Sequence, residues 1–294
     1  MRKLGYISLL LLLVLSATVI PVRSVEVGDS IIYVVNKVSG SFSYSANGST
    51  TSGSTSNYRV GNEKVPKGTE IRVNITSKIA GLVGYKIDDN GTLLATASSS
   101  EAAFGLGIFY TVFNPFVAMG LMSLTVEPIE VDKGIHMGDW VYVAPTSINW
   151  DDISNNFVNA SFWQDFMDVL TVNNAGSLNV TGTSKLLDND ETISLSFGMN
   201  GDYTNTTEET DLKIKHSIRY DYSILGRNLL GILQETDISG TVEGSTATFK
   251  VSIQVVKKGY TGLGGSVIPG FGFFAALLPL CLISTCWKRK KKMR

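Results

Sequence analysis

The residues that perform enzymatic chemistry are few in this 294-residue chain, and their spacing does not bring them together. The two histidines are His136, beside a turn, and His216, at a buried position of an alternating segment. There is no histidine pair at helical spacing, no Gly-x-Ser-x-Gly elbow and no phosphate-binding glycine loop between a strand and a helix. The adjacent Asp151 and Asp152 point to opposite sides of an extended chain or begin a helix, which argues against a glycosidase pair. We therefore predict structural histidines and a protein that is not an enzyme.

Metal and cofactor sites are not indicated either. Residues 88–90 and 188–191 contain the oxygen ligands that Ca²⁺ prefers, but they lack the spaced ligands and the closing glutamate of a calcium loop. Tight turns explain both stretches. Both cysteines, Cys281 and Cys286, lie in an apolar segment near the C-terminal end, so the rest of the chain has neither a disulfide nor a thiolate metal site. We predict no metal and no cofactor.

The N-terminal segment has the features of a signal peptide. Arg2 and Lys3 precede an apolar run from Leu9 to Leu15, and Val22-Arg23-Ser24 has the small residues that a signal peptidase accepts. Residues 1–24 are therefore the predicted leader. An uncleaved signal anchor is the alternative.

The C-terminal segment predicts a membrane span. Val267–Trp287 has no charged side chain, and five consecutive cations, Lys288 to Lys292, follow it. About 20 apolar residues cross a bilayer, and the positive cluster stays on the cytoplasmic side. The prediction is a single-pass plasma-membrane protein with an extracellular ectodomain at 25–258, a linker at 259–266, a span at 267–287 and a cytoplasmic tail at 288–294.

The charge and the glycosylation signals of the middle part agree with an extracellular location. All 26 acidic residues lie between 25 and 266, but only 16 of the 25 lysines and arginines do. Such an acidic surface repels nucleic acid, so we expect no nucleic-acid partner. Six Asn-x-Ser/Thr sequences predict glycan sites, at Asn47, Asn74, Asn90, Asn159, Asn179 and Asn205.

Apolar and polar residues alternate over much of the middle part, as in half-buried antiparallel strands. The predicted fold class is mainly β, a β-rich α+β protein of meandering antiparallel sheets that form a sandwich or one curved sheet. A Ser/Gly/Thr/Asn-rich stretch at 41–57 predicts a flexible hairpin tip. Gly28-Asp29 and Gly138-Asp139 each precede a β-branched and aromatic segment, which suggests two related halves at 25–133 and 134–258.

Two segments depart from the strand pattern. Apolar residues at helical spacing predict an amphipathic helix near 155–170, capped by Asp152 or Ser154. The run 102–126 has no charge and is long enough for a span, but a second span there would place the basic cluster after residue 287 outside the cell, against the positive-inside rule. It is predicted to be ordinary core, or to line an apolar pocket together with the helix. The aromatic residues of that pocket are Phe104, Phe109, Phe113, Phe116, Phe162, Trp163 and Phe166.

The sequence Pro269-Gly270-Phe271, followed by an apolar segment and a basic tail, resembles the C-terminal sorting signal of archaeal cell-surface proteins of the choice-of-anchor kind, whose ectodomains are uncharacterised. In that family an archaeosortase recognises the tripeptide, removes the helix and attaches a lipid. The resemblance therefore implies a sortase-type processing enzyme as a partner. The spacer 259–266 departs from the long Thr-rich linkers of that family, so a permanent span and a lipid anchor both stay open.

Two functions from different classes fit these observations. The first is a non-enzymatic, membrane-anchored, glycosylated surface protein with an envelope-structural or adhesive role, whose partners are the membrane and either further copies of itself or a surface layer. The second is a carrier or receptor for a lipid or other apolar ligand, held by a curved sheet.

Overall fold

The computed structural model describes residues 24–105, 107–108, 133–159, 163, 178–187, 191–207 and 209–263. The N-terminal strands are β1 (Ser30–Ala46), β2 (Ser49–Thr55), β3 (Asn57–Val60), β4 (Glu63–Pro66), β5 (Glu70–Ile79), β6 (Leu82–Asp89) and β7 (Thr92–Ser100). The later elements are β8 (Ile135–His136), the 3₁₀-helix η1 (Asp139–Tyr142), α3 (Trp150–Val158), β9 (Asn179–Leu187), β10 (Thr192–Asn205), β11 (Thr210–Ser223), β12 (Leu229–Val242) and β13 (Ser245–Lys257). Residues 101–105 are helical.

These strands form one large antiparallel sheet and one small sheet. The ten-stranded sheet has the order β7-β6-β5-β1-β13-β12-β11-β10-β9, and β2 pairs with the far half of β1. The three-stranded sheet has the order β4-β3-β8. The prediction of a mainly β protein built from antiparallel sheet is confirmed. Strands from both predicted halves share the large sheet, because β1 lies beside β13.

Alternation gives the long strands two different faces. In β11 the apolar Leu212 and Ile214 are buried while Lys213 and Lys215 are exposed, as the period of two requires. We call the buried side the apolar face; across β1 and β10–β13 it carries Val38, Phe42, Phe197, Ile214, Ile238 and Phe249. We call the opposite side the polar face.

Three hairpins end in two-residue turns whose conformation suits the sheet. Both residues have positive φ in Asn47-Gly48, in Asn90-Gly91 and in the turn at 243–244. This is the type I′ turn, whose twist matches that of paired strands. The stretch 41–57 is thus a hairpin, as predicted, but its first half is regular strand with Phe42 buried rather than a flexible tip.

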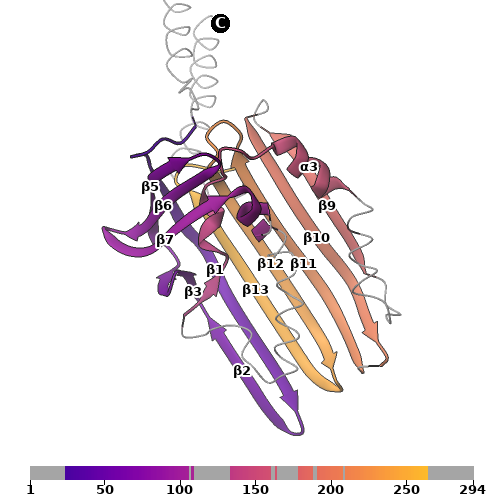
Figure 1. The fold of residues 1–294 in the computed structure, drawn as a ribbon. Helices are drawn as coiled ribbons and strands as arrows, with labels where there is room; N and C mark the ends of the chain where they lie inside the picture. The colour runs from indigo at the N-terminus through magenta and orange to yellow at the C-terminus, as the bar shows by residue number, and fades with distance from the viewer. Residues whose placement is uncertain are drawn as a thin grey trace, which may run out of the picture.

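The β5–β7 end of the large sheet forms a second layer over the upper part of the apolar face. Figure 1 shows β5, β6 and β7 lying in front of the upper ends of the long strands, which continue well beyond this layer. Tyrosine hydroxyls bind η1 to the sheet strands: the carbonyl oxygens of residues 139, 141 and 142 accept hydrogen bonds from Tyr85 (2.6 Å), Tyr222 (2.9 Å) and Tyr33 (3.2 Å). Burial raises the pKa of all three phenols above its ordinary value, so they stay neutral donors.

Two sequence predictions are wrong in this region. The segment after Gly138 forms the 3₁₀-helix η1 instead of a strand, so the second Gly-Asp motif does not repeat the first. The predicted cap, Asp152 or Ser154, is also wrong: Asn149 caps α3, and its side chain accepts from the N–H of Asp151 at 3.0 Å. Helix α3 includes the first residues of the predicted helix at 155–170, and Trp163, the one described residue of 160–170, is helical.

The chain after β13 lies against the sheet as far as Leu263. The hydroxyl of Tyr260 donates to Asp221 at 2.6 Å, and Leu263 is buried against Gly231. Tyr260 and Leu263, in the segment predicted as linker, therefore contact the sheet, while residues 259, 261 and 262 are exposed. The predicted leader up to residue 23, Pro269-Gly270-Phe271, the span and the tail lie outside the described residues. Within the described ranges, no helix is long and apolar enough to cross a membrane.

Candidate functional site

Two of the seven aromatic residues of the predicted apolar pocket are described, and they lie in different ring groups. The Phe104 ring is fully buried, 5.2 Å from the ring of Tyr222 and 6.1 Å from that of Trp150. Trp163 is buried beside Phe197 at 4.8 Å. Both side chains fill packed aromatic clusters. Phe109, Phe113, Phe116, Phe162 and Phe166 lie outside the described residues.

Four of the six predicted glycan sites are open to solvent. Asn47 and Asn90 are exposed at hairpin turns, Asn159 is exposed after α3, and Asn179 is the exposed first residue of β9. Asn74 is half-buried in β5, and its side-chain amide donates to Asp88. Asn205 is buried, and its side-chain oxygen accepts from the N–H of Thr207 at 3.0 Å.

We expect glycan occupancy to follow this exposure. An attached glycan replaces a hydrogen on the asparagine amide and needs space outside the fold, which Asn74 and Asn205 lack. Glycopeptide mass spectrometry of the protein from its native cells should find modification at Asn47, Asn90, Asn159 or Asn179. Full occupancy at Asn205 with the other sites empty would contradict this expectation.

The polar face carries an open trough that runs across seven strands. Its volume is 1160 Å³. The cross-strand register places two neighbouring rows of side chains along it. One row consists of Asn179, Asn200, Lys215, Asp237, Lys250, Ser41 and Ser54, and the other of Thr181, Gly198, Ser217, Glu235, Ser252 and Ser39. Hydroxyl, amide and paired charged groups therefore line a broad hydrated surface.

The charges in the trough largely neutralise one another. Asp237 lies between Lys215 and Lys250 in the register, with the Lys250 ammonium 3.0 Å from its carboxylate. The Lys37 ammonium lies 3.0 Å from the Glu235 carboxylate. All four paired side chains are about half exposed, so each pair stabilises the fold by less than about 1 kcal/mol. The trough suits hydrogen bonding more than the capture of a strongly charged molecule.

A second polar group lies on the opposite, apolar face. His216 on β11 and Thr236 on β12 are directly opposite each other, and His216 Nδ1 lies 2.9 Å from Thr236 Oγ1. Gln234 Nε2 donates to the same hydroxyl at 3.3 Å. All three are buried, yet His216 Nε2 and Gln234 Oε1 have no hydrogen-bond partner among the described residues. Burial lowers the pKa of His216 to about 4, so its ring is neutral at pH 7.

The sequence predicted part of this cluster. His216 was expected on the buried side of its strand, and it lies there with 3% exposure. Gln234 and Thr236 were not singled out, although they occupy positions of β12 between the buried Ile232 and Ile238. Polar residues at apolar positions of an alternating strand are the signal that could have found them.

The described ranges contain no group of three or more histidine, cysteine or acidic side chains that could hold a metal ion. Comparison with known proteins finds no matching family model, no matching curated protein and no matching solved structure.

Proposed function

We propose that the chain is a non-enzymatic, membrane-anchored surface protein with an envelope-structural role, and that its ectodomains associate through strand β9. The leader-like and span-like end segments and the acidic middle part support the location. The observation that carries the structural role is the edge of the large sheet at β9, which no strand in the described part of the chain covers.

Strand β9 has the features of an edge that accepts another strand. It pairs with β10 on one side, and no strand in the described part of the chain pairs with its other side. All nine of its residues are exposed or half-buried, and Lys185 is its one charged residue. Proteins that stay monomeric usually block such edges with charges, prolines or bulges. At β9 an apolar side chain, Leu186, is instead 51% exposed.

The sequence of β9 is complementary to itself in antiparallel pairing. A two-fold axis at Thr183 places Val180 opposite Leu186 of the second copy, and Thr181 opposite Lys185. Apolar side chains then meet on the apolar face, and no like charges are brought together on the polar face. The pairing continues both faces of the sheet into the second copy.

The test is disulfide cross-linking on intact cells. In a Thr183→Cys variant of the full chain, the two-fold axis places the new thiol beside its counterpart, so a membrane-impermeant oxidant should produce a covalent dimer. The control is Thr51→Cys on the exposed edge strand β2, which has no apolar side chain and should not cross-link. If the control thiol at position 51 is protected from impermeant reagents, the proposed location is wrong. If the thiol at position 51 is labelled but Thr183→Cys gives no covalent dimer, the proposed pairing is wrong.

Placing a charge on the edge should separate the copies. We expect Leu186→Lys in the same cysteine background to reduce cross-linking at least about tenfold, because two symmetry-related apolar contacts are lost and two cations approach the new interface. Folding should be unaffected, since Leu186 is exposed in the single copy.

A carrier of an apolar ligand is the second candidate. It is favoured by the two unpaired polar atoms on the apolar face, because ligand sites are mostly apolar with a few convergent polar groups.

A further inference from the structure

The segment after β13 folds back over the polar face of the large sheet. The Tyr260 hydroxyl donates to Asp221 at 2.6 Å, and the Gln254 side-chain amide donates to the carbonyl oxygen of Leu263 at 3.3 Å. The Leu263 side chain also lies against Gly231. Asp221, Gly231 and Gln254 each lie an even number of positions from a trough residue of the same strand, so all three are on the polar face. The last described residues therefore lie on the same side of the sheet as the trough.

Little chain separates this contact from the predicted membrane span. Residues 264–266 lie between Leu263 and Val267, the first residue of that span. An extended chain covers at most about 3.6 Å per residue, so the span begins within about 14 Å of Leu263. Given the proposed anchor, the polar face around Leu263 is therefore held close to the bilayer.

The polar face also differs in charge from the rest of the ectodomain. Over β1 and β9–β13 it carries six cations and five carboxylates, whereas residues 25–266 together contain 16 cations and 26 acids. The negative excess therefore lies away from this face, which can approach a phosphate-bearing surface without net repulsion. The charged residues of the face are Lys37, Lys185, Lys213, Lys215, Arg219 and Lys250, with Asp202, Asp211, Asp221, Glu235 and Asp237.

Pairing through β9 requires the same orientation when both copies are anchored in one membrane. The two-fold axis at Thr183 is perpendicular to the sheet, and the axis that relates two copies in one membrane is perpendicular to the membrane. The sheet then lies parallel to the membrane, and both copies turn the same face toward it. The contacts of Tyr260 and Leu263 identify that face as the polar one.

We infer that the polar face lies flat on the membrane that holds the anchor, and that its trough binds lipid head groups carrying phosphate and hydroxyl groups. Ammonium and amide groups of the trough, such as those of Lys215 and Asn200, donate to phosphate oxygens. The Glu235 and Asp237 carboxylates accept from lipid hydroxyls, and water fills the remaining space. The inference rests on the proposed anchor but not on pairing through β9.

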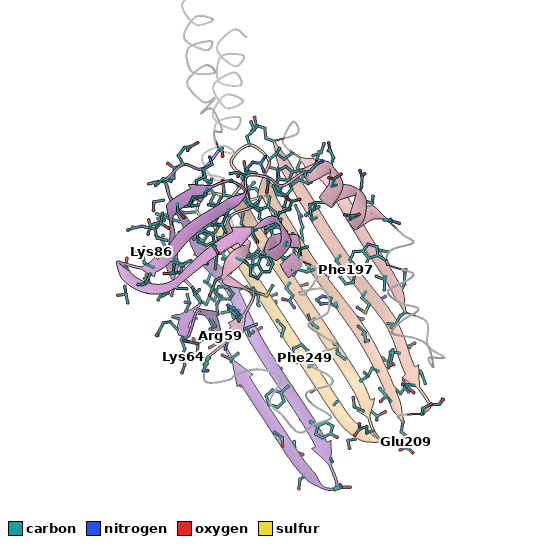
Figure 2. All side chains as sticks on the ribbon, in the orientation of Figure 1. Arg59, Lys64, Lys86, Phe197, Glu209 and Phe249 are labelled. Atoms are coloured by element: carbon teal, nitrogen blue, oxygen red, sulfur yellow. The ribbon has the colours of Figure 1, made fainter. Side chains whose placement is uncertain are left out.

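The second layer then faces away from the membrane. Figure 2 views the molecule from the side of this layer and labels Lys86 on β6. Lys86 and its cross-strand neighbour Thr96 on β7 are exposed, while Tyr85 and Ile87 are buried toward the large sheet. Thr96 therefore provides a reference position on the side opposite the trough.

The first test measures proximity to the bilayer for the full chain in vesicles of phosphatidylcholine and phosphatidylglycerol. A fluorophore is attached at Ser217→Cys, at Ser239→Cys or at Thr96→Cys, in a background of Cys281→Ser and Cys286→Ser. The quencher is a phosphatidylcholine with a nitroxide on its head group. We expect strong quenching at both polar-face positions and at least about fivefold less at position 96.

The position at 239 distinguishes a flat sheet from an upright one. Ser239 lies ten residues from Leu229, the start of β12, which corresponds to about 34 Å along a strand. A sheet standing on the β13 end would leave this position unquenched, and that result would overturn the inference while the proposed anchor stands. A chain that does not float with the vesicles would contradict both. Quenching at both positions without cross-linking through β9 would support the orientation and contradict the pairing alone.

The second test removes cations from the trough. Lys215→Gln combined with Lys250→Gln should reduce the quenching at position 239 by at least about half, because each cation near an anionic bilayer adds to the attraction. The matched control is Lys64→Gln combined with Lys86→Gln, two exposed lysines that Figure 2 labels and that lie outside the polar face. The control should leave the quenching unchanged. Equal losses in the two double variants would mean that overall charge, and not the trough, attracts the bilayer.

Discussion

Replacing Arg219 with methionine is expected to lower the free energy of unfolding by about 3–5 kcal/mol, since it leaves a buried carboxylate without its cation. Asp221 is fully buried, and Arg219 binds both of its oxygens, with Nε and Nη2 each 2.8 Å away. The Arg219 side chain is 32% exposed, but its two-point contact to a fully buried carboxylate is stronger than an ion pair in which both partners are exposed. Denaturant unfolding of the purified protein, followed by circular dichroism, measures the loss.

Two control variants distinguish the buried pair from an ordinary charge effect. Lys250→Met removes an ion pair of similar length, to Asp237, but both partners are exposed, so the loss should stay below about 1 kcal/mol. Adding Asp221→Asn to Arg219→Met removes the buried charge and should restore part of the stability. If Arg219→Met and Lys250→Met cost the same, the Asp221 site is not the strong contact described above.

Replacing Gly240 with alanine should lower the free energy of unfolding by a similar amount, about 3–5 kcal/mol, because β11 and β12 leave no room for a side chain there. A Cβ at this position would lie 2.0 Å from the carbonyl oxygen of Asp211 and 2.9 Å from the Cα of Leu212, both backbone atoms of β11. Gly240 also has a φ of 151°, which residues with a side chain rarely adopt. The two strands would have to separate near the end of the sheet.

Gly28→Ala is the matched control for Gly240→Ala. Gly28 also has a positive φ, of 95°, but a Cβ there meets no atom within 4 Å. Its replacement should therefore show the cost of the backbone conformation alone, about 1–2 kcal/mol. Thermal unfolding of both variants measures the difference between their losses of stability. Equal losses would contradict the prediction, because they would mean that the Cβ of Gly240→Ala does not collide with β11.

Local patterns in the sequence predicted the features that depend on near neighbours. Alternation in β11 and β13 predicted half-buried strands, and the turn residues Asn47-Gly48 and Asn90-Gly91 suited the hairpins that are observed. The buried position of His216 follows from the same alternation. These features need only the period of a strand and the backbone freedom of a turn residue.

Features that depend on distant contacts were missed or wrongly predicted. Residues 139–142 have the composition of a strand, but their carbonyl groups are bound by tyrosines from β1, β6 and β11, and the segment forms η1. No local pattern reveals these tyrosines as partners. The polar rows of the trough likewise depend on the register of seven strands, and Asn205 is a glycan signal by sequence but a buried side chain in the fold.

The position of β1 beside β13 has a consequence for the order in which the protein can fold. β1 is made first and occupies the middle of the sheet, yet its longest partner, β13, is the last strand of the described chain. The hairpins from β9 to β13 can form as soon as each is synthesised, but the central pair must wait for the whole sheet-forming sequence. Such late, long-range closure slows folding and leaves both strand edges uncovered in the meantime. We therefore expect chains that end before β13 to aggregate rather than to form a smaller version of the same sheet.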